Sequence, residues 1–187
     1  MFRERLFQEP HHGMSGKLVY VMGYPGCGKT TATALALGGD AVEVRDKPFK
    51  HIKYADGLVQ LGMIRESYGG TDALPMNVQP AVVQWLAQAQ PPRVVGEGDR
   101  LGNGKFFHAV LSAGFNLTMV YLAVPELVAQ YRAWRRGSRF ADSWFRGRIT
   151  KVNRLVSAWG KYIAVVDGTA EQAAVAEELR AIINGKA

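Results

Sequence analysis

Short, mainly apolar stretches alternate with amphipathic segments along most of this chain. Stretches typical of strands buried on both faces of a sheet occur at 17–22, 93–97, 117–124 and 162–166. Between them, apolar residues recur at helical spacing, as at Val82, Val83, Leu86 and Ala89. Apolar strands that alternate with helices predict an α/β fold whose mainly five-stranded parallel sheet is covered by helices on both faces.

The remaining elements follow from the same periodicity and from turn residues. Helices are predicted at 29–37, 78–90, 105–114, 125–136, 143–159 and 171–183. A second strand is expected at 41–45. The turn pair Asp56-Gly57 lies between 51–54 and 58–61, which predicts a hairpin. Gly38-Gly39 and Pro91-Pro92 mark the ends of the first two helices.

The length and composition indicate one globular domain. The chain has 187 residues, of which 48% are hydrophobic. We expect a flexible lead-in over 1–16 and a single domain over 17–187, with no linker or internal repeat. No apolar run approaches the roughly 20 residues of a membrane span. The one cysteine, Cys27, excludes an internal disulfide framework and fits a reducing compartment, so we expect a cytoplasmic protein.

The most specific motif is a glycine-rich loop between the first strand and the first helix. It fits the pattern G-x-x-x-x-G-K-[ST], and its residues are Gly23, Tyr24, Pro25, Gly26, Cys27, Gly28, Lys29 and Thr30. Glycines let the backbone curl so that successive N–H groups face a phosphate, and the helix N-terminus adds its dipole. The strand, loop and helix therefore predict a nucleoside triphosphate site.

Each residue type in this loop has an expected task. Lys29 reaches the β- and γ-phosphates, and Thr30 ligates Mg²⁺. We expect ATP and Mg²⁺ to be bound, with the loop's cofactor-binding residues being Gly23, Gly26, Cys27, Gly28, Lys29, Thr30 and Thr31.

A second candidate site follows the strand at 93–97. Acidic side chains at the carboxyl end of a buried strand lie where a parallel sheet binds its ligands. Glu97 and Asp99 are therefore candidate metal ligands, directly or through water. Arg100 is expected to point at a phosphate or at the acceptor. A solvated turn is the alternative.

The positive charge of the chain comes from one segment. The net charge is +7, and residues 132–154 carry all of it, with Asp142 as their only acid and with these bases: Arg132, Arg135, Arg136, Arg139, Arg146, Arg148, Lys151 and Arg154. The first four stand at i, i+3, i+4 and i+7, which predicts one helix face. Such a concentration of charge indicates a polyanionic ligand, although basic runs are also found as solvated faces.

Two polyanions fit this segment. A mobile arginine lid over about 132–154 could supply positive charge to the transferring phosphoryl group of ATP. We expect Arg136 to take the catalytic part and Arg132, Arg135 and Arg139 to contact the nucleotide. Alternatively, the segment binds a nucleic acid backbone, and bases stack on the interleaved aromatic residues Phe140, Trp144 and Phe145.

A kinase also needs a carboxylate beside the acceptor hydroxyl. Asp46 follows the second strand, and Asp72 lies in the loop 69–72, so both are candidates. Gly168, in the loop after the last strand, could border the phosphate loop and contact adenine. A plain turn with Thr169 as the helix N-cap is an equal alternative.

These motifs together resemble the P-loop kinases of the nucleoside-monophosphate kinase and thymidylate kinase group. The shared parts are the loop 23–30, the pair Asp99-Arg100 and the arginines of 132–139. The resemblance implies that Asp99 and Arg100 handle the metal and the acceptor phosphate. Leu101 stands where ordinary thymidylate kinases have an aromatic residue, which weakens an assignment to free nucleotides.

The chain resembles more closely the bacteriophage kinases that act on 5-hydroxymethyluracil in DNA. The similar stretches are 70–74, 78–80, 97–101, 136–138, Trp144, 147–148 and 150–151. This resemblance implies transfer of the γ-phosphate of ATP to the base hydroxymethyl group, with double-stranded DNA carrying modified thymidine as partner and the host cytoplasm as compartment. Two alternatives remain, a nucleoside or deoxynucleoside monophosphate kinase and a nucleotide-switched DNA-binding ATPase.

Overall fold

The computed structural model describes residues 16–65 and 69–186. Apart from Gly16, the lead-in expected at 1–16 lies outside these residues. In the described part of the chain, every helix is too short or too polar to cross a membrane.

The centre of the molecule is a seven-stranded sheet in the order β2-β3-β4-β5-β1-β6-β7. The strands are β1 (Lys17–Met22), β2 (Ala41–Val44), β3 (His51–Tyr54), β4 (Leu58–Leu61), β5 (Arg93–Glu97), β6 (Asn116–Ala123) and β7 (Ile163–Asp167). The five strands from β4 to β7 in this order are parallel, as expected. The sheet is wider than predicted, because β2 and β3 extend its edge by antiparallel pairing.

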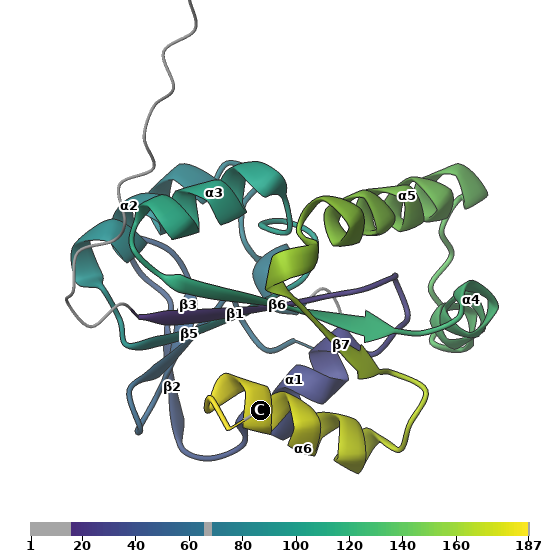
Figure 1. The fold of residues 1–187 in the computed structure, drawn as a ribbon, viewed down its shortest axis with the longest axis horizontal. Coiled ribbons are helices and arrows are strands. Elements are labelled where there is room, and N and C mark those ends of the chain that lie inside the picture. Colours follow the sequence, from purple (N-terminus) through teal and green to yellow (C-terminus); the bar gives the residue numbers. More distant parts are fainter. Residues whose placement is uncertain (1–15, 66–68, 187) are drawn as a thin grey trace, which may run out of the picture.

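Helices cover both faces of the sheet (Figure 1). They are α1 (Lys29–Leu37), α2 (Gln79–Ala89), α3 (Gly104–Ser112), α4 (Glu126–Arg135), α5 (Asp142–Ala158) and α6 (Gln172–Ile183). In Figure 1, α2, α3 and α5 lie above the sheet, and α1 and α6 lie below it. α4 stands at the carboxyl end of the parallel strands, beside the loop that follows β1.

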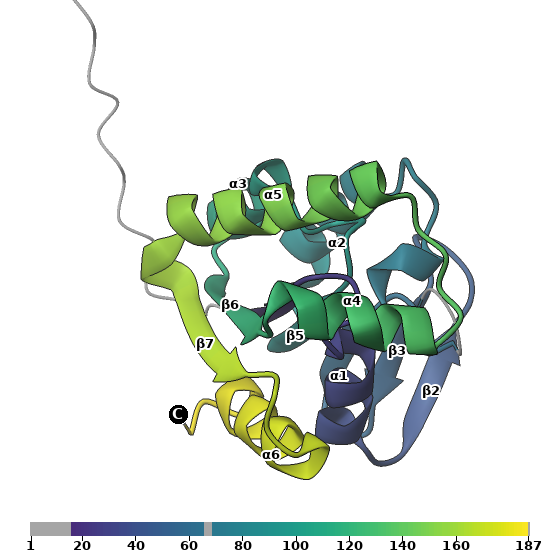
Figure 2. The ribbon, with the colours of Figure 1, turned by 90° about the vertical axis from the view of Figure 1, so that its right-hand side faces the viewer.

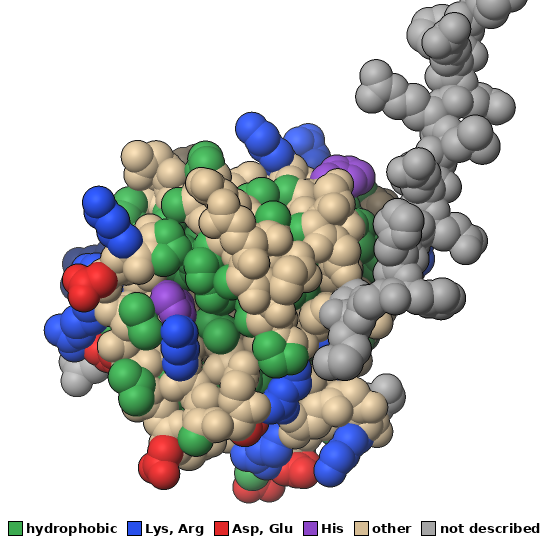
Figure 3. All heavy atoms as spheres, turned by 90° about the vertical axis from the view of Figure 1, so that its left-hand side faces the viewer, with side chains coloured by type: hydrophobic (Ala, Val, Ile, Leu, Met, Phe, Trp, Pro, Cys, Tyr) green, Lys and Arg blue, Asp and Glu red, His purple; other side chains and the backbone are tan. Residues whose placement is uncertain are grey.

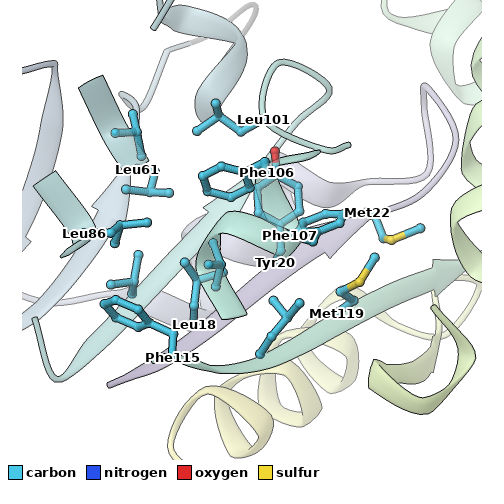
Figure 4. Packing of buried hydrophobic residues seen from close by; sticks show 14 of the residues in the cluster. Leu18, Tyr20, Met22, Leu61, Leu86, Leu101, Phe106, Phe107, Phe115 and Met119 are labelled. Atoms are coloured by element: carbon cyan, nitrogen blue, oxygen red, sulfur yellow. The ribbon is translucent and has the colours of Figure 1, made fainter. Parts of the chain in front are cut away.

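The two faces of β1 explain this layering. Leu18, Tyr20 and Met22 point into a core shared with α2, α3 and α5, which Figure 4 shows around the Tyr20 ring. Val19 and Val21 point into a second core shared with α1 and α6. Because successive residues of a strand face opposite sides, one six-residue apolar run contributes to both cores.

The boundary of α4 corrects one prediction. The helix ends at Arg135, and the chain turns at Gly137, which has a φ of +76°. Arg136 is the C-cap residue, and Arg139 lies in the connection to α5. The expectation that these arginines share one helix face with Arg132 is therefore wrong, because the glycine ends the helix before the last of them.

Candidate phosphoryl-transfer site

The glycine-rich loop has the strand, loop and helix context predicted for it. β1 ends at Met22 and α1 begins at Lys29, so the loop lies at the carboxyl edge of the sheet. Gly26 and Gly28 have φ angles of +89° and +101°, a region that side chains disfavour. A Cβ on Gly26 would lie 2.1 Å from the carbonyl oxygen of Ala129, so α4 packs directly against the loop.

Lys29 holds the loop in its curled form. Its Nζ donates hydrogen bonds to the carbonyl oxygens of Gly23 at 2.9 Å and Tyr24 at 3.1 Å. The ammonium group therefore lies inside the loop, where it can exchange a carbonyl for a phosphate oxygen. Cys27 is buried in the same loop, and Thr31 is exposed in the first turn of α1.

Thr30 and Glu97 form the candidate metal site. The hydroxyl of Thr30 donates to Oε1 of Glu97 at 3.1 Å, and Glu97 is 2% exposed. Burial raises the pKa of Glu97, while the charge of Lys29 and the Thr30 hydrogen bond oppose this shift.

This pair fits Mg²⁺, which in phosphate sites takes one or two carboxylates and completes its shell with phosphate oxygens and water. Clusters of three or more His, Cys, Asp or Glu suited to an all-protein metal cage do not occur among residues 16–65 and 69–186.

The turn after β5 is held in place by hydrogen bonds from two neighbouring elements. Oδ1 of Asp72 accepts from the backbone N–H groups of Asp99 at 2.9 Å and Arg100 at 2.8 Å. The hydroxyl of Tyr20 donates to the carbonyl oxygen of Gly98 at 2.9 Å. Asp72 thus lies beside the turn after β5, and one of its oxygens positions that turn.

Arg100 lies beside this turn with a donor to spare. Its Nη2 reaches the carbonyl oxygen of Asp72 at 3.4 Å, a long hydrogen bond. Within the described residues, its buried Nε has no hydrogen-bond partner. A buried guanidinium donor without a partner is costly, which favours an anionic ligand at this position.

Asp99 is bound by α5, a connection that sequence reasoning missed. Its carboxylate contacts Nη1 of Arg148 at 2.5 Å and Nζ of Lys151 at 2.6 Å. Lys151 also donates to the backbone carbonyl of Asp99 at 3.0 Å. The i, i+3 spacing of these two bases places them on one helix face, which was the available signal, but nothing in the sequence paired that face with Asp99.

The loop after β7 borders the phosphate loop, as expected. A Cβ on Gly168 would lie 3.6 Å from the carbonyl oxygen of Cys27, and Arg132 donates to the carbonyl oxygen of Gly168 at 2.8 Å. The alternative role of Thr169 as N-cap is wrong. Its hydroxyl donates to Asp167, and α6 begins only at Gln172, after the cap residue Glu171.

Four other predicted residues are exposed on the surface of the molecule. Asp46 is exposed after β2, and β3 and β4 separate that strand from β5. Arg135, Arg136 and Arg139 are also exposed. Among the described residues, no hydrogen bond or ion pair joins any of these four to Thr30, Glu97 or the turn after β5.

Two of the three aromatic residues proposed for base stacking lie on the α5 side. Phe140 and Trp144 stack on one another with centroids 4.3 Å apart, and the guanidinium of Arg148 lies over the Trp144 ring at 5.1 Å. Phe145 is 4% exposed and belongs to the interior, so a stacking role for it is wrong.

A parallel sheet with a glycine-rich phosphate loop, a hydrogen-bonded Thr–Glu pair and basic residues beside them is typical of a P-loop kinase, which is a phosphotransferase. The chain belongs to the family described as P-loop Nucleotide Kinase3, whose model matches residues 14–185.

Comparison with curated proteins gives no match. Among solved structures, the chain is similar to a gluconokinase from Sinorhizobium meliloti 1021, with a TM-score of 0.52 and 19% sequence identity over 92% of this chain and 93% of that one. At this identity the likeness bears on the fold alone.

Proposed function

We propose that this protein is an ATP- and Mg²⁺-dependent kinase that phosphorylates the hydroxymethyl group of 5-hydroxymethyluracil within DNA. On the donor side, Lys29 and the loop N–H groups bind the triphosphate, and Thr30 and Glu97 would hold Mg²⁺. When bound, the ion would supply positive charge to the transferring phosphoryl group. The 3.1 Å contact of Thr30 with Glu97 supports this arrangement.

The observation that carries the DNA assignment is the basic and aromatic α4–α5 side of the molecule. Both helices stand on the same side (Figure 2), and the segment from 132 to 154 supplies the entire net charge. On the opposite side, charged residues of both signs are scattered near the margin (Figure 3). A small acceptor has no use for such a field, whereas a DNA backbone gains affinity from it.

This basic side reaches the turn after β5 through the ion pairs of Arg148 and Lys151 with Asp99. Arg148 lies over Trp144 and contacts the carboxylate of Asp99. DNA bound to α5 would therefore lie next to Asp99 and Arg100. In this scheme Arg100 binds an acceptor or transferring phosphoryl oxygen, and Arg132, Arg135, Arg136 and Arg139 close over the nucleotide.

The group that orients the acceptor hydroxyl remains one of two aspartates. Asp72 lies beside the turn 98–100 and binds its N–H groups through Oδ1, which leaves Oδ2 as the oxygen that would orient a hydroxyl group. Asp46 would have to act from the far strands of the sheet. Full turnover in both Asp46→Asn and Asp72→Asn would contradict an aspartate base.

The rival is a kinase with a small acceptor, such as a nucleoside monophosphate. A small acceptor is what the name of the structural neighbour, a gluconokinase, indicates for that protein. A third reading, a DNA-binding protein switched by ATP, predicts phosphate release to water only.

Incubation with γ-labelled ATP, Mg²⁺ and separate acceptors distinguishes the three. The acceptors are plain DNA, DNA with 5-hydroxymethyluracil, and free nucleoside monophosphates. Label in the hydroxymethylated DNA alone is expected. Label in a free nucleotide alone would make the protein a nucleotide kinase.

A further inference from the structure

A pocket of about 480 Å³ lies between the start of α3 and one face of α5. The residues of α5 that line it recur at helical spacing. The full lining is Asn103, Gly104, Gly147, Thr150, Lys151, Arg154 and Leu155. The two helices cover the same face of the sheet (Figure 1). The pocket is distinct from the loop 23–30, because none of that loop's residues lines it.

The lining of this pocket is positively charged. Lys151 and Arg154 line it, and among residues 16–65 and 69–186 no acidic side chain does. Asn103 caps α3 by accepting from the N–H group of Phe106, and Asn103 and Gly104, at the start of that helix, both line the pocket. An anion in the pocket would thus meet two cations from α5 and the positive end of α3.

Gly147 keeps the pocket open at a cost to its helix. It lies in the middle of the 17-residue α5, where glycine is about 1 kcal/mol less favourable than alanine. A Cβ built on it meets no atom within 4 Å, so packing does not require glycine there. Neither helix propensity nor packing explains Gly147, whereas the space that it leaves for a ligand does.

Lys151 connects this pocket to the reaction centre. Lys151 lines the pocket, and its ammonium group contacts the carboxylate of Asp99 at 2.6 Å. The donor phosphates are expected in the loop 23–30. A ligand bound near Lys151 and Asp99 would therefore belong to the acceptor. Two cationic side chains beside the N-terminus of a helix match the chemistry of a phosphate group.

We propose that this pocket binds a phosphate group of the acceptor, with Lys151 and Arg154 as cationic ligands. The inference rests on the proposed function, because it takes the acceptor to carry a phosphate. That phosphate is a phosphodiester next to the modified nucleoside in DNA, or the 5′-phosphate of a free nucleotide. Binding there would place the acceptor hydroxyl on the inner side of Lys151, toward Asp99.

Equilibrium binding tests the pocket independently of catalysis. With a non-hydrolysable ATP analogue saturating the phosphate loop, we would titrate thymidine, thymidine 5′-monophosphate and a duplex containing 5-hydroxymethyluracil by calorimetry. Arg154→Gln and Gly147→Leu should each weaken the phosphate-bearing probe that binds wild type by about tenfold or more, since a charge-assisted contact or the space for it is lost.

Matched controls separate the pocket from charge and folding effects. Arg45→Gln removes an exposed arginine directly after β2, and Gly160→Leu adds the same side chain at another open glycine. Both should bind as wild type does, and thermal unfolding should show all four variants folded. The glycine variants are informative because leucine favours helix over glycine.

Each result has a defined meaning. Weakening of the monophosphate alone assigns the pocket to free nucleotides, and weakening of the duplex alone assigns it to the DNA backbone. Wild-type affinity in both pocket variants overturns the inference, as does a wild-type protein that binds thymidine as tightly as its monophosphate and ignores the duplex. If the pocket variants weaken monophosphate binding while no label enters DNA, the pocket stands and the DNA kinase assignment fails.

Discussion

The hydroxyl of Thr30 donates a 3.1 Å hydrogen bond to Oε1 of Glu97, so the first turn of α1 contacts the last residue of β5. These residues are 67 positions apart in the chain. Parallel pairing of β1 with β5 aligns Val21 with Glu97 and thereby brings the phosphate loop to the carboxylate. The donor half of the site thus depends on one strand register.

Glu97→Gln tests this carboxylate as the metal ligand. Glutamine keeps the size of the side chain and can still accept from Thr30, so the variant should fold. It cannot supply an anionic ligand to Mg²⁺, and phosphoryl transfer should fall by about 100-fold or more. Initial rates across a Mg²⁺ titration measure the effect. Glu43→Gln, on exposed β2, is the control and should retain the wild-type rate; equal rates in both variants would refute the assignment.

Gly26→Ala tests the contact between the phosphate loop and α4. The added Cβ would overlap the carbonyl oxygen of Ala129 and would also strain a residue with φ of +89°. Gly39→Ala has a comparable positive φ of +117° but meets no atom within 4 Å. The Gly39 variant should lose only the backbone strain, about 1–2 kcal/mol.

The Gly26 variant should lose more stability than the Gly39 variant, because the clash adds to the strain. It should also bind ATP more weakly. Urea unfolding and nucleotide titration of the two variants provide the comparison. If both variants lose the same unfolding free energy, α4 can move away from the added Cβ at no cost, which would contradict the close packing of α4 on the phosphate loop.

Tyr20→Phe tests how the turn after β5 is positioned. The buried hydroxyl of Tyr20 donates to Gly98 and lies 3.1 Å from the hydroxyl of Thr71. Removing it leaves a buried carbonyl without its donor, which should cost about 1–3 kcal/mol of unfolding free energy. Because the turn carries Asp99 and Arg100, kcat should decrease while the affinity for ATP is retained.

If Tyr20→Phe also loses affinity for ATP, the role of the Tyr20 hydroxyl is not confined to the turn after β5. Tyr54→Phe is a suitable control, since the hydroxyl of Tyr54 in β3 donates to Gln60 in the neighbouring strand β4. That variant should leave kcat unchanged.

His51 predicts a pH dependence of stability. It is 2% exposed beside Phe49 and Trp85, and burial lowers its pKa below the ordinary value of 6.5. The unfolded chain therefore takes up a proton near pH 6.5 that the native protein does not. Its contribution to stability is complete above that pH and decreases as the pH falls from 6.5 toward the lowered native pKa.

Chemical unfolding between pH 5 and pH 8 measures this slope. His51→Gln should be less stable at pH 8 but have a flatter profile over the same range. His108→Gln, at an exposed position of α3, should keep the wild-type slope. An unchanged slope in His51→Gln would assign the pH dependence to other groups.

The sequence by itself determined the local parts of this protein. The apolar runs located four strands of the parallel sheet, and the Asp56-Gly57 turn located the hairpin whose second strand, β4, is the fifth. The spacing of Gly23, Gly28 and Lys29 located the phosphate loop. These features are local because strand burial, turn geometry and the phosphate loop each depend on a few neighbouring residues. Even the arginine concentration at 132–154 was visible as a charge count.

Only the tertiary structure decided which distant groups meet. The pairing of Asp99 with Arg148 and Lys151, the use of Asp72 to hold the turn 98–100, and the pocket beside Gly147 all join segments that are far apart in the chain. Such contacts depend on sheet order and helix placement, which periodicity does not encode. The positive φ of Gly137 likewise marks the end of α4, and it separates arginines that a continuous helix would have aligned.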